Sequence, residues 1–478
     1  MLLYFNMNNI ETFDWMTYVL HNEDLQKAGI NTKEKAWNHW IVSGSKEGRI
    51  SYDLVGGRNS DNIFNWRSYV SRYEDLQRAE IETEEKAFEH FIVYGRFEGR
   101  IYNSTPKNNK LNIIYQVGNT AEQGCNTGIQ RVVRLLGKYF HQKCNLYLVK
   151  FDRTALRFVD ITCKERKWLE NFNGIPFPFK LLDLSQENKW FVNAEISYDI
   201  PSTKLMFDEA RRNNMKIATL YYDDIQFKMN HLWPSCTRES YNIFIRNLCE
   251  ADLIFPISQY SQSRLQSHVA ITNIDTNKKI FPCILPGEFP NVERNYHYNI
   301  PKSNKYHILC VGVINSRKNQ ISLLQAISKL KNKSNIVFTL VGPIDSGDKR
   351  YNDVLRLMKL NKVIHHNQVS DDHLKNLYLN SHLTVFPSIE EGFGLPILES
   401  IWNCRPCICM NNGAMGEIAT GGCLKVDCND PKQISDAIER ILYNNDFREK
   451  LIDEIKLVKF KTWNQYTDEV IENILRSI

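Results

Sequence analysis

The stretch Glu391-Gly392-Phe393-Gly394-Leu395-Pro396-Ile397-Leu398-Glu399 places a carboxylate on each side of a glycine-rich turn. Glycines at positions 392 and 394 let the backbone approach a ligand and adopt dihedral angles that a Cβ would forbid. Pro396 suits the first turn of a helix, where its missing amide hydrogen costs nothing. The start of such a helix favours an anion such as phosphate, because free amides and the helix dipole point toward it. A sugar nucleotide matches this pattern, since it has hydroxyls at both ends and a diphosphate between them.

The residues before this stretch support a phosphate-binding unit. His382 to Ser388 predicts a buried strand that ends at Pro387. A strand, a glycine loop and a helix in succession are typical of a doubly wound parallel sheet. An ordinary strand-to-helix turn that happens to contain two glutamates explains the local pattern equally well. The local sequence therefore leaves both interpretations open.

Several ordered motifs resemble one family. The run from Val385 to Glu399 resembles the signature of the retaining family-four glycosyltransferases of the GT-B fold, in which seven residues separate two glutamates. Four other runs resemble later and earlier motifs of that family: Val311 to Asn319, Leu340 to Pro343, Met415 to Ala419 and Lys461 to Trp463. The similarity extends from about Leu111 to the end of the chain. It implies an α/β protein with two Rossmann-like domains facing a cleft, and a glycosyltransferase activity.

The resemblance also implies roles for single residues. Glu391 is expected to bind the donor sugar and to steady positive charge at the anomeric carbon, and Glu399 to accept the ribose hydroxyls. Arg317 and Lys318 are expected to neutralise the diphosphate, so that neither a metal nor another cofactor is needed. Asp223 completes the expected catalytic set. The further residues expected to contact the nucleotide sugar are Gly128, Gly312, Gly392, Phe393 and Gly394.

The Arg317-Lys318 pair lies just before a predicted helix. Ile321, Leu324 and Ile327 recur at helical spacing, so a core-facing helix is expected to begin near Asn319. A guanidinium fork and a point charge at a helix start are good diphosphate ligands. Two basic residues before a helix are more often solvated, and the family match favours the functional interpretation here.

Two regions of the expected acceptor-side domain carry further candidate residues. The predicted strand from Ile217 to Tyr222 ends at Asp223, where relatives have a His-Asp pair. Tyr222 occupies the histidine position, which puts histidine-assisted chemistry in doubt. Behind Gly128 a helix is expected, and Arg131 on it either neutralises donor charge or faces solvent. The sequence favours neither role for Arg131.

Composition limits the function classes. The chain has 478 residues, is 42% hydrophobic and carries a net charge of +5. This size allows about three domains, and the small charge does not suggest a nucleic-acid binder. No stretch approaches the ~20 apolar residues of a membrane span. The expected partners are a nucleotide-sugar donor and a glycan or glycoconjugate acceptor, while peripheral membrane contact and oligomeric state stay open.

The twelve cysteines favour a reducing, cytoplasmic location. Cys404, Cys407 and Cys409 are close enough to suggest zinc, but no second pair of ligands follows at zinc spacing. The apolar residues around Cys407 and Cys409 favour a buried strand instead.

An internal repeat fills the N-terminal region. Phe13 to Ile50 returns as Phe64 to Ile101. Each copy predicts two or three short helices closed by a glycine turn. The Glu-Gly-Arg end of each copy either binds a glycan or partner, or caps a turn, and the second interpretation is favoured. A polar linker is expected at 103–110.

These patterns predict five segments. They are two helical repeats at 1–53 and 54–104, an acceptor domain at 105–295, a donor domain at 296–460 and a C-terminal helix at 461–478 that crosses back to the acceptor domain. An alternative function is a catalytically inactive GT-B scaffold or glycan-binding protein that acts through its repeats.

Overall fold

The computed structural model describes most of the chain. The described residues are 10–477 except for 11–12, 48, 50–63, 97, 99, 101, 103–109, 123–125, 173, 177–179, 197–199, 234, 273–278, 291 and 300–302. The predicted linker and the glycines of both Glu-Gly-Arg ends thus lie outside the described residues. Two compact units emerge: one contains the described parts of 1–124 and 140–191, and the other those of 125–139 and 192–477.

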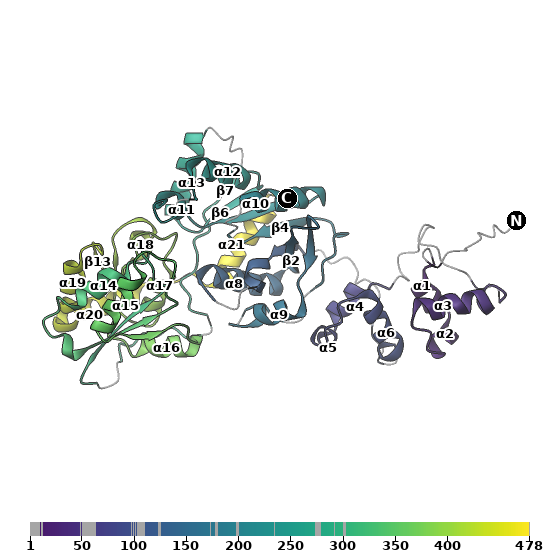
Figure 1. The fold of residues 1–478 in the computed structure, drawn as a ribbon, viewed down its shortest axis with the longest axis horizontal. Coiled ribbons are helices and arrows are strands. Elements are labelled where there is room, and N and C mark those ends of the chain that lie inside the picture. The colour runs from purple at the N-terminus through teal and green to yellow at the C-terminus, as the bar shows by residue number, and fades with distance from the viewer. Residues whose placement is uncertain are drawn as a thin grey trace. The chain divides into compact units, whose positions relative to one another are not determined.

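The first unit begins with two sets of short helices, spaced 51 residues apart, which are purple in Figure 1. The first set is α1 (Trp15–Leu20), α2 (Glu23–Lys27), α3 (Lys33–His39) and the π-helical η2 (Trp40–Gly44). The second set is α4 (Trp66–Arg72), α5 (Glu74–Arg78), α6 (Glu84–His90) and the π-helical η4 (Phe91–Gly95). Both sets share one apolar core, which includes Phe13, Leu25, Phe64 and Leu76.

Each repeat ends in a polar cluster, whereas the glycine turn predicted to close it involves residues outside the described ones and stays a prediction. Gly44 lies in the π-helical segment, where a Cβ would come within 2.1 Å of the Tyr18 hydroxyl. That hydroxyl bonds to His39 Nδ1 at 2.9 Å. Arg49 forms ion pairs with Asp24 at 2.6 Å and with a second carboxylate nearby. The arginine of the Glu-Gly-Arg end is therefore engaged within its own repeat.

The second repeat has the same cluster. Tyr69 bonds to His90 at 2.8 Å, and a Cβ on Gly95 would again come within 2.1 Å of the tyrosine hydroxyl. Arg100 pairs with Asp75 at 2.8 Å. The recurrence indicates that this cluster is the structural requirement that both copies share.

A seven-stranded sheet follows, with strand order β3-β2-β1-β4-β5-β6-β7. Its strands are β1 (Asn112–Gln116), β2 (Asn145–Asp152), β3 (Arg157–Asp160), β4 (Lys189–Asn193), β5 (Lys216–Tyr221), β6 (Leu253–Pro256) and β7 (Lys279–Ile280). β3 pairs antiparallel with β2, whereas β1 with β2, β5 with β6 and β6 with β7 pair in parallel. β1 and β5 are almost wholly buried, as is typical of parallel strands covered on both faces.

Among the described residues, seven helices accompany this sheet along the chain. They are α7 (Gly118–Glu122), α8 (Gly128–Lys143), α9 (Cys163–Glu170), α10 (Ile200–Arg212), α11 (Ile225–Lys228), α12 (Arg238–Leu248) and α13 (Gln259–Thr272). α9 begins with a capping box. The Thr162 side chain accepts from the Glu165 amide, and the Glu165 side chain accepts from the Thr162 amide.

The second unit also holds a six-stranded sheet with the order β10-β9-β8-β11-β12-β13. Its strands are β8 (Tyr306–Val311), β9 (Ile336–Val341), β10 (Ile364–His366), β11 (Leu383–Phe386), β12 (Cys407–Met410) and β13 (Cys423–Val426). All of its pairs are parallel. Cys407 and Cys409 are buried in β12, which confirms the strand predicted there. The predicted α/β class with two Rossmann-like sheets is likewise confirmed.

The helices of this part are green to yellow in Figure 1. They are α14 (Gln320–Ile327), the 3-10 helix η5 (Lys333–Asn335), α15 (Tyr351–Leu360), α16 (Asp371–Leu379), α17 (Leu395–Trp402), α18 (Gly413–Ile418), α19 (Pro431–Tyr443), α20 (Asn445–Leu457) and α21 (Trp463–Leu475). α14 and α17 begin where the sequence predicted helices. None of the described helices is both long and apolar enough to cross a membrane.

The last helix, α21, contacts residues that precede the six-stranded sheet. Lys216 of β5 donates to the Ser477 carbonyl at 2.7 Å, and Glu288 accepts from the Trp463 amide at 2.7 Å. A capping box at Thr462 and Gln465 begins this helix.

Candidate functional site

The site forms at the centre of the six-stranded sheet. β8 and β11 are neighbours there, and the chain continues from them toward opposite edges. The loops that leave these two strands therefore flank one crevice, which is where ligands bind in open parallel sheets. Gly312, with φ at +140°, follows β8 directly. Residues 387–394 follow β11.

These two loops bring together three residues that the sequence predicted as catalytic. The Glu391 carboxylate forms ion pairs with Arg317 at 2.8 Å and with Lys318 at 2.6 Å. Ser388 donates a short hydrogen bond to the same carboxylate. Lys318 also lies 4.9 Å from the centre of the Phe386 ring, an aromatic cation contact. The three charged groups are at most 18% exposed, so little solvent screens them.

Burial and pairing set the charge states of this cluster. Burial acts to raise the pKa of Glu391, but Arg317 and Lys318 outweigh it and lower that pKa to about 2. Burial lowers the pKa of Lys318, and the Glu391 carboxylate opposes this effect. Glu391 is therefore ionised near neutral pH.

Gly392 lies against the end of β5. A Cβ at this position would come within 2.5 Å of the Tyr222 carbonyl and 2.9 Å of Asp223 Oδ2, so only glycine fits. The Gly392 carbonyl accepts from Ser258 at 2.9 Å. Burial raises the pKa of Asp223 to about 6. The structure thus brings Asp223 to the Glu391 loop, as the sequence predicted for a catalytic set.

The rest of the glycine loop turns the chain into α17. Gly394 takes φ at +117° as the N-cap residue, a conformation that disfavours a side chain. Phe393 is 5% exposed, so its ring serves packing, and only its backbone is left for the predicted ligand contact. Pro396 lies in the first turn of α17.

Glu399, predicted to bind ribose, lies on α17 with a partner on each oxygen. Tyr378 donates to Oε2 at 2.8 Å, and Arg131 of α8 makes a short ion pair with Oε1. Burial acts to lower the pKa of Arg131, but Glu399 and then Asp371 outweigh it and raise that pKa. The Arg131 side chain therefore pairs with Glu399 and does not face solvent, while its predicted role in neutralising donor charge stays a prediction.

Gly128 lies near the same helix. A Cβ on Gly128 would stand 3.7 Å from Leu395, an ordinary contact distance. The space beside Gly128 alone therefore does not require glycine. Its predicted role in binding the donor stays a prediction.

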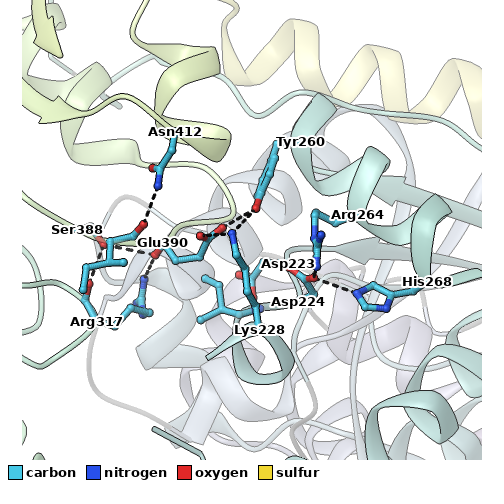
Figure 2. A network of polar contacts seen from close by, with 12 residues as sticks. Asp223, Asp224, Lys228, Tyr260, Arg264, His268, Arg317, Ser388, Glu390 and Asn412 are labelled. Atoms are coloured by element: carbon cyan, nitrogen blue, oxygen red, sulfur yellow. Dashed lines mark hydrogen bonds and ion pairs between the residues drawn. The ribbon is translucent and has the colours of Figure 1, made fainter. Parts of the chain in front are cut away.

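One polar network at the site was missed by sequence reasoning. Lys228 of α11 bonds to Glu390 at 2.6 Å, and Tyr260 of α13 donates to the other oxygen of Glu390 at 2.8 Å (Figure 2). The amides of Gln259 and Tyr260 donate to Glu417 at 3.0 and 2.8 Å. Single charged residues spread over 190 positions carry no local pattern, so no sequence signal marked this network.

Tyr222 does not replace the missing histidine. It is 6% exposed, and its hydroxyl donates to the Ala194 carbonyl at 2.6 Å. Its hydroxyl is therefore held by the protein backbone, where it stabilises the end of β5.

Comparison with known proteins identifies part of the chain. Residues 293–458 match the family model of the glycosyl transferases group 1, so this segment carries a domain of that family. O-antigen chain mannosyltransferase B of Escherichia coli is 29% identical over 215 residues, which are 42% of this chain and 55% of the relative. O-antigen chain mannosyltransferase RfbU of Salmonella typhimurium is 30% identical over 140 residues, which are 29% of this chain and 39% of the relative. The chain thus spans about half, or less, of the length of these curated relatives.

Two solved structures share the fold. HepE of Anabaena, solved in complex with UDP and glucose, has a TM-score of 0.57 at 11% identity and covers 77% of this chain and 100% of its own. Sucrose-phosphate synthase of Thermosynechococcus elongatus has a TM-score of 0.55 at 14% identity, with 77% and 99% covered. At these identities the likeness shows the fold alone, and it confirms the predicted GT-B architecture.

Proposed function

We propose that this chain, which carries a group 1 glycosyl transferase domain, is a retaining glycosyltransferase. It moves a hexose or deoxyhexose from a nucleotide diphosphate sugar to a glycan or glycoconjugate acceptor. The observation that best supports this is the convergence of Arg317, Lys318 and Glu391 beside a glycine loop that starts a helix. Retention is proposed from the resemblance of the Glu391–Glu399 motif to that of retaining enzymes.

The two cations provide the charge that the leaving group needs. Arg317 and Lys318 both pair with Glu391, and both are largely buried. A diphosphate that enters this loop takes over part of that pairing, because phosphate oxygens accept from the same donors. Charge stabilisation by fixed donors of this kind accelerates group transfer without a metal ion. We therefore propose that the transfer is metal-independent.

Glu391 keeps its negative charge beside the transferred sugar. Its low pKa means that it stays ionised while positive charge develops at the anomeric carbon. Asp223 lies across from Gly392 and accepts a hydrogen bond from the acceptor hydroxyl when ionised. Glu399 accepts the ribose hydroxyls after Arg131 moves away from Oε1.

The names of the similar proteins indicate which nucleotide sugars to test first. Both curated relatives quoted above are named mannosyltransferases of O-antigen chains, and HepE was solved with UDP. We take GDP-mannose as the first candidate donor and UDP-sugars as the second. The free, mostly buried cysteines of the described chain agree with a cytoplasmic setting.

A transfer assay with product analysis tests this proposal. Purified protein is incubated with GDP-mannose and a mannose-terminated oligosaccharide, with and without EDTA, and NMR reads the anomeric configuration of the product. We expect the donor configuration to be kept and the rate to be unaffected by EDTA. Lys318→Ala should lower kcat/KM for transfer about 10²–10³-fold, whereas Lys359→Ala, which removes an exposed lysine from α15, should leave it unchanged. Inversion, or loss of activity in EDTA, would contradict the mechanism.

A catalytically inactive scaffold is the alternative. The absence of histidine at position 222 favours it. The paired Arg317, Lys318 and Glu391 favour the enzyme. Binding of a nucleotide sugar without any turnover, with every acceptor tried, would support the scaffold.

A further inference from the structure

Two buried serines at the start of α13 connect the loop after β11 with the end of β5. Ser258 directly precedes α13, and Ser261 lies in the first turn of this helix. Both side chains are fully buried. The Ser258 hydroxyl donates to the Gly392 carbonyl at 2.9 Å, and the Ser261 hydroxyl donates to the Tyr222 carbonyl at 2.5 Å. The pair therefore links a strand of the seven-stranded sheet to a loop of the six-stranded sheet.

The protons of the two hydroxyls suffice for both carbonyls. A serine hydroxyl has one proton to donate and two lone pairs that accept. Donation from Ser258 to Gly392 and from Ser261 to Tyr222 gives each buried carbonyl one donor. Ser258 also accepts from the Ser261 amide at 2.9 Å, as a residue that caps a helix does. Each hydroxyl thus has a defined orientation.

The other serines of α13 use their hydroxyls differently. Ser263 donates to the Gln259 carbonyl at 3.0 Å, and Ser267 donates to the Ser263 carbonyl at 2.8 Å. These bonds run back one turn, which is a common arrangement for a serine inside a helix. Both of these serines are exposed. Ser261 instead donates outside its helix, to a carbonyl 39 positions away.

The first turn of α13 is also held from the side of the six-stranded sheet. The amides of Gln259 and Tyr260 donate to Glu417 of α18, and the Tyr260 hydroxyl donates to Glu390 at 2.8 Å (Figure 2). The two serines therefore lie on a helix end that several polar contacts fix in place.

The two carbonyls belong to neighbours of the groups proposed to act in transfer. Tyr222 precedes Asp223, which is proposed to accept from the acceptor hydroxyl, and Gly392 follows Glu391. The two segments are in close contact, because a Cβ on Gly392 would come within 2.5 Å of the Tyr222 carbonyl. Two carbonyl oxygens cannot bond to each other, since both are acceptors. The serine hydroxyls supply the donors that let these segments lie together.

The bond from Ser258 also sets the direction of the next amide. In a planar trans peptide, the Gly392 carbonyl and the Phe393 amide point in opposite directions. The carbonyl points at α13, so the amide points away from this helix. The Phe393 amide has no hydrogen-bond partner among the described residues. It is therefore left for the ligand contact that the sequence predicted for Phe393.

We infer that Ser258 and Ser261 are positioning residues for transfer, which hold Asp223 at a fixed place relative to the Glu391 loop. The inference rests on the proposed transferase function, and both serines act through the backbone. A reaction between two bound molecules depends on their mutual placement, and a shift of about 1 Å can lower its rate ~100-fold. Hydrolysis of the donor depends less on this placement, because the attacking water is not part of a bound acceptor. Loss of either hydroxyl should therefore lower transfer more than hydrolysis.

Four single variants of the full chain test the inference. Ser261→Ala and Ser258→Ala each remove one donor, whereas Ser258→Thr keeps it. Ser263→Ala is the matched control, because it removes an exposed hydroxyl from the same helix. Transfer to a mannose-terminated oligosaccharide, and hydrolysis without an acceptor, are measured with GDP-mannose and with UDP-glucose. Thermal unfolding shows which variants are folded.

We expect Ser261→Ala to lower kcat for transfer about tenfold, with the donor KM within about twofold of the wild type. The ratio of transfer to hydrolysis should fall with it. Ser258→Ala should act in the same way, and Ser258→Thr and Ser263→Ala should match the wild type. Ser261 does not cap α13, so Ser261→Ala tests the inference even if Ser258→Ala fails to fold.

Two results would overturn the inference while the wild type stays active. One is an unchanged kcat for transfer in Ser261→Ala. The other is an equal loss of transfer and hydrolysis, which would indicate general damage to the donor loop. A wild type that neither transfers nor hydrolyses either nucleotide sugar would instead refute the proposed function, and this inference with it.

Discussion

The loops after β8 and β11 and the end of β5 lie in the same unit, yet their buried carboxylates differ in how completely they are paired. On the donor side the functional carboxylates Glu391 and Glu399 are already paired, the first with two cations and the second with Arg131. At the end of β5, Asp224 Oδ2 accepts from Arg264 and His268, while its buried Oδ1 has no hydrogen-bond partner among the described residues. A nucleotide sugar that binds to the loops after β8 and β11, as proposed, would therefore have to exchange existing pairs.

This difference has an energetic meaning. A buried ion pair contributes little net stability, but loss of one partner costs roughly 3–5 kcal/mol because a buried charge is left alone. Removing a single partner from these pairs is therefore expected to destabilise the loops, because a buried charge would be left alone.

The largest effect should follow from removing a donor-side cation. Lys318→Ala takes away one of the two charges that meet the diphosphate, and we expect kcat/KM to fall about 10²–10³-fold. Steady-state kinetics with the preferred donor measures this, with Lys359→Ala as the control. Wild-type kinetics in Lys318→Ala would show that Arg317 and Lys318 do not stabilise the diphosphate leaving group. The loops after β8 and β11 would then not be the donor site.

A smaller effect is expected at the ribose end. Glu399→Ala removes a charged acceptor, and we expect the donor KM to rise about 10–100-fold. Arg131→Gln should act in the opposite direction and lower the donor KM, because the ribose no longer competes with the guanidinium. An increase in KM for both variants would mean that Arg131 binds the donor itself rather than competing with it.

The pH dependence of kcat/KM for the acceptor should report the ionisation of Asp223. Burial raises the pKa of Asp223 from 3.8 to about 6, so this group is protonated below that pH and ionised above it. Since the ionised form accepts the acceptor hydroxyl, kcat/KM for the acceptor should rise as pH rises through about 6. Asp223→Asn should remove this acidic limb and lower kcat/KM about tenfold at high pH. A rate that falls through the same range would require the protonated form.

The smallest effect should come from the Lys228–Glu390 pair. Lys228 is 40% exposed, and solvent screens its attraction for Glu390. Lys228→Ala should lower the free energy of unfolding by less than about 1 kcal/mol and leave the donor KM unchanged. Chemical denaturation and donor kinetics check both parts. A large change in donor KM would extend the donor site to α11.

The sequence predicted much of the donor side because its residues lie in two short motifs. Arg317 and Lys318 follow one strand, and Glu391 follows another. Adjacent placement of parallel strands in the middle of a sheet brings such loops together. The helices at 320–327 and 395–402 followed from periodicity and from the glycine loop.

Other features depended on distant parts of the chain and could not be predicted. Arg131 reaches Glu399 across 268 positions, and no local pattern reports this contact. The sequence showed Asp224 only as a neighbour of Asp223, because an unpartnered oxygen is a property of three-dimensional packing. The role of Gly44 could not be predicted for a similar reason: Gly44 makes room for the hydroxyl of Tyr18, 26 positions away.

Donor binding tests the central claim most directly. The thermal stability of the full chain is measured with GDP-mannose, UDP-glucose and dTDP-sugars, in the wild type and in the Lys318→Ala and Lys359→Ala variants. We predict that one nucleotide sugar raises the Tm of the wild type and of Lys359→Ala but not of Lys318→Ala. If no nucleotide sugar raises the Tm, or if Lys318→Ala responds like the wild type, the loops after β8 and β11 are not a donor site.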